Sequence, residues 1–258
     1  MSGQIHVDRD GPICTITLEN EGKRNALSPD FLPDVREALA DCEHEDVRVV
    51  VFTGTGENAF SAGYDISEFS DQDESEERDP EFRDTVEAIA DYPYPTIAMI
   101  NGVAVGGAFE FVAACDLRVA VDDARFGITP ARLGLVYEGR GVRRVVDVVG
   151  PANAKELLFT ADLVDADRAK EMGLLNHVVP REDLESTTYD IAETIAGNAP
   201  LSLTGTKKIV DAVCDKRAFS DAEDEWAARL SREAFESRDH ANAVAAFQAG
   251  EDPEFEGR

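Results

Sequence analysis

Apolar positions in the first half of the chain alternate between short strand-like runs and helical patterns. The strand-like runs occupy residues 13–20, 47–54, 95–102 and 116–121. Residues 28–45 and 79–93 instead repeat their apolar side chains at helical spacing. In the first of these ranges, Ser28 precedes Pro29, which is typical of a helix cap and first turn. This order of strands and helices predicts an α/β domain.

From about Pro151 onward the pattern becomes mostly helical. Candidate helices cover residues 151–161, 165–173, 184–198, 200–215 and 222–237. The acidic stretch at 70–79, "SDQDESEERD", has no apolar periodicity, and we expect it to be a solvated loop.

Charge is the unusual feature of the composition. The 258 residues include 53 acids and 25 bases, a net charge of −28, while 43% of the residues are hydrophobic. That apolar fraction is too large for a disordered chain, so the acids predict a solvated surface on a folded domain. Their mutual repulsion is tolerable where salt screens it, which indicates a halophilic source. The same charge argues against nucleic acid or an anionic membrane as partner.

A test of the halophilic interpretation is the response of stability to salt. Because salt screens the repulsion between acids, the melting temperature is expected to rise from low to molar KCl. The measurement is a thermal melt across that range, and a flat or falling curve would contradict the interpretation.

Compartment signals point to the cytoplasm. No run of about 18 apolar residues predicts a membrane span, and "MSGQIHVDRDGP" lacks the features of a secretory signal. The four cysteines, at positions 14, 42, 115 and 214, have no metal-ligand spacing and are expected to be reduced, mostly buried thiols.

Candidate chemistry begins with "NGVAVGGAFEFVAACD" at 101–116, a glycine-rich, apolar stretch with one carboxylate. Gly106 and Gly107 allow the backbone to approach a ligand, and N–H groups at a helix start stabilise a negative oxygen. Glu110 then lies one turn along that helix. The spacing does not match a dinucleotide-binding G-x-G-x-x-G, and Gly107 stands where a capping box needs Ser or Thr. On spacing alone, both a structural role and a functional role for Glu110 remain open.

A second glycine turn follows the 47–54 run. Ala62, Gly63 and Tyr64 form either an ordinary turn, with Asp65 capping a short helix, or a second source of backbone N–H groups. Two such turns at the ends of neighbouring strands would form an oxyanion hole for a thioester enolate.

At these residues the chain resembles the crotonase superfamily, the enoyl-CoA hydratase/isomerase family. The resemblance rests on "RNALS" (24–28), "FSAGYDI" (60–66), "NGVAVGGAFE" (101–110), "FGITPARLGL" (126–135), "GPANAKELLFTA" (150–161) and "AKEMGLLNHVVP" (169–180). It implies an α/β spiral of ββα units over residues 1–195, with the acyl-CoA site. It also implies a helical C-terminal region, 196–258, that builds homotrimers or homohexamers.

The resemblance also implies the roles of individual residues. Tyr64 and Gly107 would supply the oxyanion-hole N–H groups, and Glu110 matches the first catalytic glutamate of hydratases. The expected substrate-binding residues are Arg24, Ala62, Gly63, Asp65, Ile66, Gly106 and Thr129. No metal and no cofactor beyond the coenzyme A of the substrate are implied.

Two positions depart from the hydratase pattern. Pro130 stands where the second glutamate would follow the proline of "FG-x-P-E". Glu138, eight residues later, matches a position where dienoyl-CoA isomerases carry a catalytic aspartate, although a solvated loop acid is the alternative. At the C-terminus, "FQAGEDPEF" (247–255) replaces a basic motif that contacts CoA phosphate in many relatives.

The overall motif pattern is most similar to the methylmalonyl-CoA decarboxylase branch. There, the residues that match Tyr137 and Thr129 lie at the acyl end. That branch has histidine at the position of Tyr64 and asparagine at that of Glu138. Hydration or double-bond migration on an enoyl-CoA is the first expectation, with Glu110, Glu138 and Tyr137 as catalytic candidates. Decarboxylation of a malonyl-type CoA thioester, or acyl-CoA binding without catalysis, are the alternatives.

Overall fold

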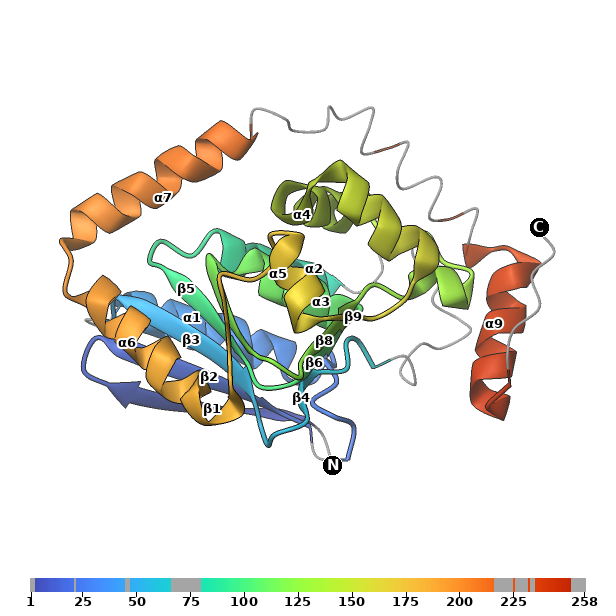
Figure 1. The fold of residues 1–258 in the computed structure, drawn as a ribbon, viewed down its shortest axis with the longest axis horizontal. Coiled ribbons are helices and arrows are strands. Elements are labelled where there is room, and N and C mark those ends of the chain that lie inside the picture. The colour runs from blue at the N-terminus through green and yellow to red at the C-terminus, as the bar shows by residue number, and fades with distance from the viewer. Residues whose placement is uncertain are drawn as a thin grey trace.

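The computed structural model describes residues 3–20, 22–44, 47–65, 80–215, 225, 232 and 235–251. Its strands form two sheets (Figure 1). The larger has the order β1-β2-β3-β5-β7-β10, from strands Gln4–Asp10, Ile13–Glu19, Val49–Gly54, Thr96–Ile100, Leu117–Val121 and His177–Val179. The smaller has the order β4-β6-β8-β9, from strands Ala59–Ser61, Val103–Val105, Arg125–Gly127 and Val164–Asp165.

The chain builds these sheets by repeating a ββα unit. In each repeat, the first strand joins the large sheet, the second joins the small sheet, and a helix follows: β3-β4-α2, β5-β6-α3 and β7-β8-α4. The helices run as α1 Leu32–His44, α2 Pro80–Ala90, α3 Gly107–Ala114, α4 Gly139–Thr160, α5 Ala166–Glu171, α6 Leu184–Ala196, α7 Pro200–Asp215 and α9 Arg238–Ala249. Two 3-10 helices, η2 and η3, cover Pro130–Leu133 and Arg181–Asp183. The expected spiral of ββα units is therefore confirmed.

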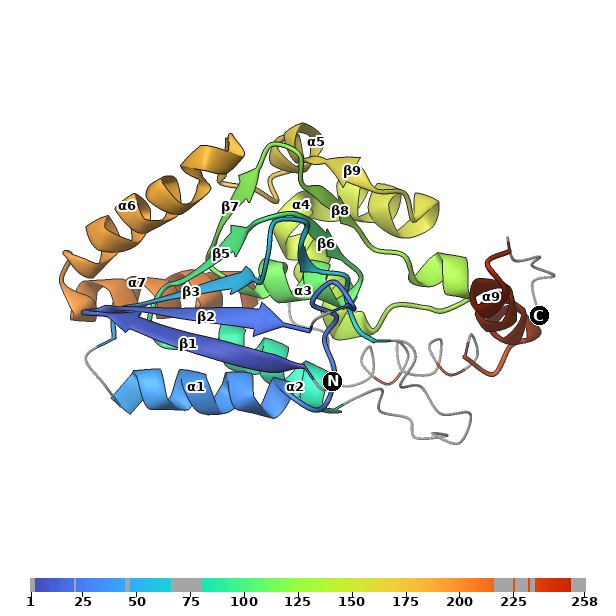
Figure 2. The same cartoon turned by 90° about the horizontal axis from the view of Figure 1, so that it is seen from below.

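The central parallel strands are apolar because both of their faces are covered. Every residue of β3 and of β5 is buried. Helices α1 and α2 lie on one side of the large sheet and α6 lies on the other, as Figure 2 shows. Parallel strands covered on both faces read as continuous apolar runs, which is why these strands were predicted from the sequence.

Aromatic packing fixes helix α3 between the two sheets. The Phe111 ring contacts Phe52 of β3 at a centroid distance of 5.2 Å and Phe60 of β4 at 5.7 Å, both edge to face. Phe109 is also fully buried. Such pairs add to the stabilisation that burial of a phenylalanine already gives. The two phenylalanines thus anchor the short helix that carries Glu110.

Several predicted boundaries differ from the structure. The helix expected at 28–45 begins at Leu32, because Leu27 pairs with Tyr64 in a parallel bridge and residues 29–31 form a turn before the helix. The helix expected at 79–93 ends at Ala90. The helix expected at 151–161 is the second half of α4, whose first half was missed.

Glycine explains the division of α4. Gly150 has φ 75°, a conformation that interrupts the helix, and it separates the two halves.

Some elements of the structure were not predicted from the sequence. These are strands β1, β4, β6, β8, β9 and β10 and helix α9. The expected helix at 222–237 and loop at 70–79 fall almost wholly outside the described residues.

The C-terminal helices α6 and α7 match their predicted ranges closely. Three of the four cysteines are buried and all four are free thiols, as expected. A helix long and apolar enough to cross a membrane is not found in the described part of the chain.

Candidate active site

A cavity of about 770 Å³ opens beside the N-terminus of α3. The sequence-predicted residues that line it are Ala62, Gly63, Tyr64, Asp65, Gly106, Gly107, Glu110, Thr129, Tyr137 and Glu138. The structure therefore brings together residues from three separate ββα repeats. Two expected members stand apart: the exposed Arg24 is not among the lining residues, and Ile66 lies outside the described residues.

The glycine turn before α3 forms part of the wall of this cavity. Gly106 has φ 60° and ψ −123°, which only glycine adopts readily, and its own N–H donates to the carbonyl of Gly127 at 2.9 Å. Gly107 is the first residue of the helix, where N–H groups have no partner within the helix. This turn accordingly presents the Gly107 N–H at the positive end of the α3 dipole.

The second glycine turn lies against the first. Leu27 accepts from the N–H of Asp65 and donates to the carbonyl of Gly63, both at 2.8 Å. Because successive N–H groups of extended backbone alternate in direction, the Tyr64 N–H points to the side opposite Leu27. A methyl group added to Gly63 would lie 3.3 Å from the Gly107 nitrogen, so the two turns are in contact. The Tyr64 and Gly107 backbones thus lie beside one another at the wall of the cavity.

Glu110 lies at the wall of the same cavity with both carboxylate oxygens engaged. The Tyr137 hydroxyl donates to Oε2 at 2.7 Å, and Arg144 Nη1 donates to Oε1 at 3.1 Å. The side chains of Glu110 and Arg144 are only 10% and 18% exposed. Glu110 is therefore neither a capping residue nor a solvated acid: it is a buried carboxylate held by two donors.

Burial governs the protonation of this cluster. Burial raises the pKa of Glu110 above its ordinary value, and the Tyr137 hydrogen bond and the charge of Arg144 only partly offset this. The pKa of Tyr137 is also raised well above its ordinary value, by burial first and then by the charge of Glu110. Burial thus favours the protonated form of both Glu110 and Tyr137.

Gly141 makes the contact between Tyr137 and Glu110 possible. A methyl group added there would lie 2.6 Å from Cε1 of Tyr137 and 2.7 Å from Oε2 of Glu110. Sequence reasoning missed both Gly141 and Arg144. A partial signal was present, since Gly141 and Arg144 are three residues apart and so lie on one face of α4.

Glu138 and Pro130 both line the cavity. Glu138 is the N-terminal cap residue of α4 and is half-buried. Pro130, at the position of the second hydratase glutamate, begins the short helix η2 and also lines the cavity. Glu138 therefore contributes a carboxylate to the lining of the cavity, and Pro130 contributes an apolar ring.

Basic side chains surround the cavity despite the acidity of the chain. Among the described residues that line it, Lys23, Arg83, Arg132, Arg140 and Arg144 are basic, and Asp65, Glu87, Glu110 and Glu138 are acidic. Lys23 forms an ion pair with Asp65, in the place where Arg24 was expected to act. The cavity thus carries far less negative charge than the molecule as a whole.

Helix α9 contributes to the mouth of the cavity. His240 Nδ1 lies 2.8 Å from the carbonyl oxygen of Leu133, which attaches α9 to η2. Phe247, 61% exposed, lines the cavity from this helix. The chain therefore offers an aromatic side chain at the mouth, in the first position of the motif "FQAGEDPEF".

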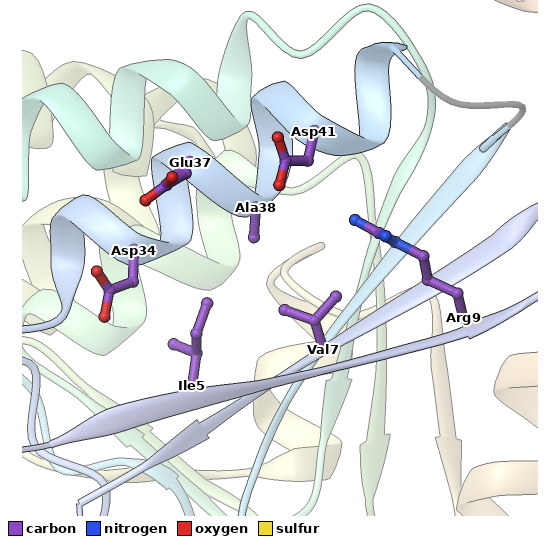
Figure 3. A pocket seen from close by; sticks show the side chains of 7 residues that line it. All are labelled: Ile5, Val7, Arg9, Asp34, Glu37, Ala38 and Asp41. Carbon is purple, nitrogen blue, oxygen red and sulfur yellow. The ribbon is translucent and has the colours of Figure 1, made fainter.

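A second cavity, of about 470 Å³, lies between α1 and β1 (Figure 3). Its lining consists of Ile5, Val7, Arg9, Asp34, Glu37, Ala38 and Asp41. Ile5, Val7 and Arg9 extend from β1 toward α1, which carries Asp34, Glu37 and Asp41, as Figure 3 shows. It has no glycine turn and no pair of inward-facing amides, so its chemistry does not match that of the larger cavity. Within the described residues, no group of three or more His, Cys, Asp or Glu side chains could hold a metal ion.

Comparison with known proteins identifies a family model and individual relatives that match this chain. Residues 8–258 match the family model described as enoyl-CoA hydratase/isomerase. The chain is 34% identical to methylmalonyl-CoA decarboxylase of Escherichia coli over 98% of both chains, and 32% identical to short-chain-enoyl-CoA hydratase of Clostridium acetobutylicum over 94% of both. A solved structure of methylmalonyl-CoA decarboxylase in complex with 2-nitronate-propionyl-CoA superposes with a TM-score of 0.90, at 31% identity and 98% coverage of both chains.

Proposed function

The chain belongs to the enoyl-CoA hydratase/isomerase family, and we propose that it forms a thioester enolate on the amides of Tyr64 and Gly107. The observation that carries this proposal is the contact between two glycine turns at the wall of a cavity that also holds Glu110. A developing negative charge on a carbonyl oxygen is stabilised by such preorganised donors. An acyl-CoA thioester supplies that oxygen.

The basic side chains of the cavity support a CoA substrate. CoA carries phosphate groups, which arginine and lysine bind through charge-assisted hydrogen bonds. We propose that Lys23, Arg83 and Arg132 contact these phosphates, since they line the cavity and remain partly exposed. They would replace both Arg24 and the basic C-terminal motif that this chain lacks.

Decarboxylation of a malonyl-type CoA thioester is the reaction that the geometry supports best. Tyr137 and Arg144 each donate to one oxygen of Glu110, which leaves fewer acceptor positions for a water molecule. Pro130 replaces the carboxylate that would hold it from the other side. Decarboxylation needs no base to begin. With Glu110 protonated, the Tyr137 hydroxyl would turn its hydrogen from Glu110 to the departing carboxylate, which Thr129 would also hold.

The proposed reaction has two steps. The bond between the α-carbon and the carboxylate breaks, its electron pair moves onto the thioester oxygen between the two amides, and carbon dioxide leaves. The α-carbon then takes a proton from protonated Glu110, which regains one from solvent. Its raised pKa keeps the protonated form accessible for this step.

Hydration or isomerisation of an enoyl-CoA is the second candidate. Glu138 favours it, because a second carboxylate that lines the cavity would serve as the partner of Glu110. The similarity to the short-chain-enoyl-CoA hydratase supports the same alternative.

One experiment separates the two reactions. Wild type, Tyr137→Phe and Glu138→Gln are assayed with methylmalonyl-CoA and with crotonyl-CoA. For decarboxylation, Tyr137→Phe is expected to lower kcat/KM about tenfold or more, because it removes the hydroxyl that would hydrogen-bond to the charged carboxylate of the substrate. Glu138→Gln should change that rate by less than about threefold, since under this proposal Glu138 transfers no proton.

Three outcomes would change the proposal. Turnover of crotonyl-CoA that collapses in Glu138→Gln would favour hydration. Rapid decarboxylation in Tyr137→Phe would remove Tyr137 from the mechanism. Tight binding of acyl-CoA with no turnover of either thioester would support a non-catalytic binding protein.

We also propose that the chain assembles into homotrimers or homohexamers. Helix α7 exposes Ile209 and Val210, at 67% and 53%. Exposed apolar side chains on one helix are typical of a surface that another subunit covers.

A further inference from the structure

The Glu110–Arg144 ion pair is a feature of the site that formation of an enolate does not by itself require. The oxyanion hole needs two amides, and a proton donor needs only one carboxyl group. Yet Arg144, from the second turn of α4, reaches a carboxylate of α3 across the wall of the cavity. A buried arginine beside a catalytic carboxylate changes both where that carboxylate points and how firmly it holds a proton.

We propose that Arg144 is a positioning residue: it clamps Oε1 of Glu110, offsets the burial of that charge, and so leaves the carboxyl group able to release its proton to the substrate. The geometry carries this step. Arg144 binds one oxygen of Glu110 at 3.1 Å and Tyr137 binds the other at 2.7 Å, so the two donors fix the plane of the carboxylate. The inference rests on the proposed function only in so far as the reaction uses the Glu110 proton.

Other charged groups around Glu110 act in the opposite direction or lie farther out. Glu87 on α2 raises its pKa, as a like charge must. Glu87 is in turn paired with Arg140 at 3.1 Å, and Glu138 lines the cavity before α4. Among the described residues, Arg144 is therefore the cation in direct contact with Glu110, and its charge lowers the pKa that burial raises.

Removal of the Arg144 charge should make Glu110 hold its proton more tightly. An opposite charge in contact commonly changes the proton affinity of a carboxylate by about tenfold to 1,000-fold. In Arg144→Gln, the proton affinity of Glu110 is expected to rise about tenfold or more. Arg143→Gln is the matched control: it removes the same charge from the neighbouring position of α4, where Arg143 pairs with Asp147, and it should leave Glu110 unchanged.

Two measurements test the proposal on the full-length protein. The first is a ¹³C NMR titration of protein labelled at glutamate side chains, in which the Glu110 signal is the one absent from Glu110→Gln. The second is the pH profile of kcat/KM. We expect the Glu110 transition to move to higher pH in Arg144→Gln in both, and not to move in Arg143→Gln.

The titration needs no substrate, so it separates this proposal from the proposed reaction. Suppose that the protein decarboxylates no thioester, and that the Glu110 titration still moves to higher pH in Arg144→Gln. The role proposed for Arg144 is then supported, and the proposed reaction is contradicted. An unmoved signal in Arg144→Gln, or an equal change in Arg143→Gln, would overturn the clamp. Should Arg144→Gln not fold, Arg144→Met removes the same charge while it keeps the apolar stem, and the same two results apply.

Discussion

Glu110→Gln is expected to lower kcat/KM for decarboxylation of a malonyl-type CoA by about 100- to 10,000-fold, the range typical of lost acid–base catalysis. Glutamine preserves the shape of the side chain and can still accept from the Tyr137 hydroxyl. It cannot donate the proton that the α-carbon requires. Steady-state kinetics with methylmalonyl-CoA measure the loss.

The pH dependence of the same reaction provides a second test of Glu110 as the proton donor. If protonated Glu110 is the donor, wild-type kcat/KM falls as pH rises through its raised pKa, because the donor form disappears. In Glu110→Gln this fall should be absent. A variant that keeps near-wild-type turnover, or the same pH dependence, would show that Glu110 does not transfer the proton.

Loss of the Gly107 amide is expected to cost about 100- to 1,000-fold in kcat, as the removal of one oxyanion-hole donor does. Gly107→Pro deletes the N–H at the first helical position of α3, where proline is compatible with the helix. Binding of the substrate should change less than its turnover, because the amide acts mainly on charge that develops in the transition state.

Gly107→Ala provides the comparison for this variant. Alanine also adds carbon at this position, near the Phe82 ring and the Tyr64 nitrogen, but it keeps the N–H. The ratio of the kcat values of the two variants therefore isolates the contribution of the Gly107 N–H. A folded Gly107→Pro protein with turnover within about threefold of Gly107→Ala would contradict the assignment of the oxyanion hole.

The parts of the fold that the sequence predicted are those with a strong local signal. Buried parallel strands such as Val49–Gly54 are continuous apolar runs, and helices such as Leu184–Ala196 carry a clear amphipathic period. Strands of two or three residues, such as Val103–Val105, are too short for any period to be visible. Their pairing is set by the ββα repeat rather than by their own residues.

The residues of the candidate site also divide into those with a strong local signal in the sequence and those without one. Gly106, Gly107 and Glu110 were predicted because the chemistry of a glycine turn and a nearby carboxylate is contained within one segment. Arg144 lies 34 residues after Glu110, and only the packing of α4 on α3 brings the two side chains together. Lys23 was missed for a related reason, since its ion pair with Asp65 depends on the bridge between Leu27 and Tyr64.

Formation of a thioester enolate is the central claim, and decarboxylation in heavy water tests it most directly. Methylmalonyl-CoA is turned over in D₂O, and the thioester product is analysed by mass spectrometry and NMR. The account predicts release of carbon dioxide and one deuterium at the α-carbon of propionyl-CoA, both strongly reduced in Gly107→Pro. Neither carbon dioxide release nor α-deuteration, from a folded protein that binds the thioester, would contradict the account.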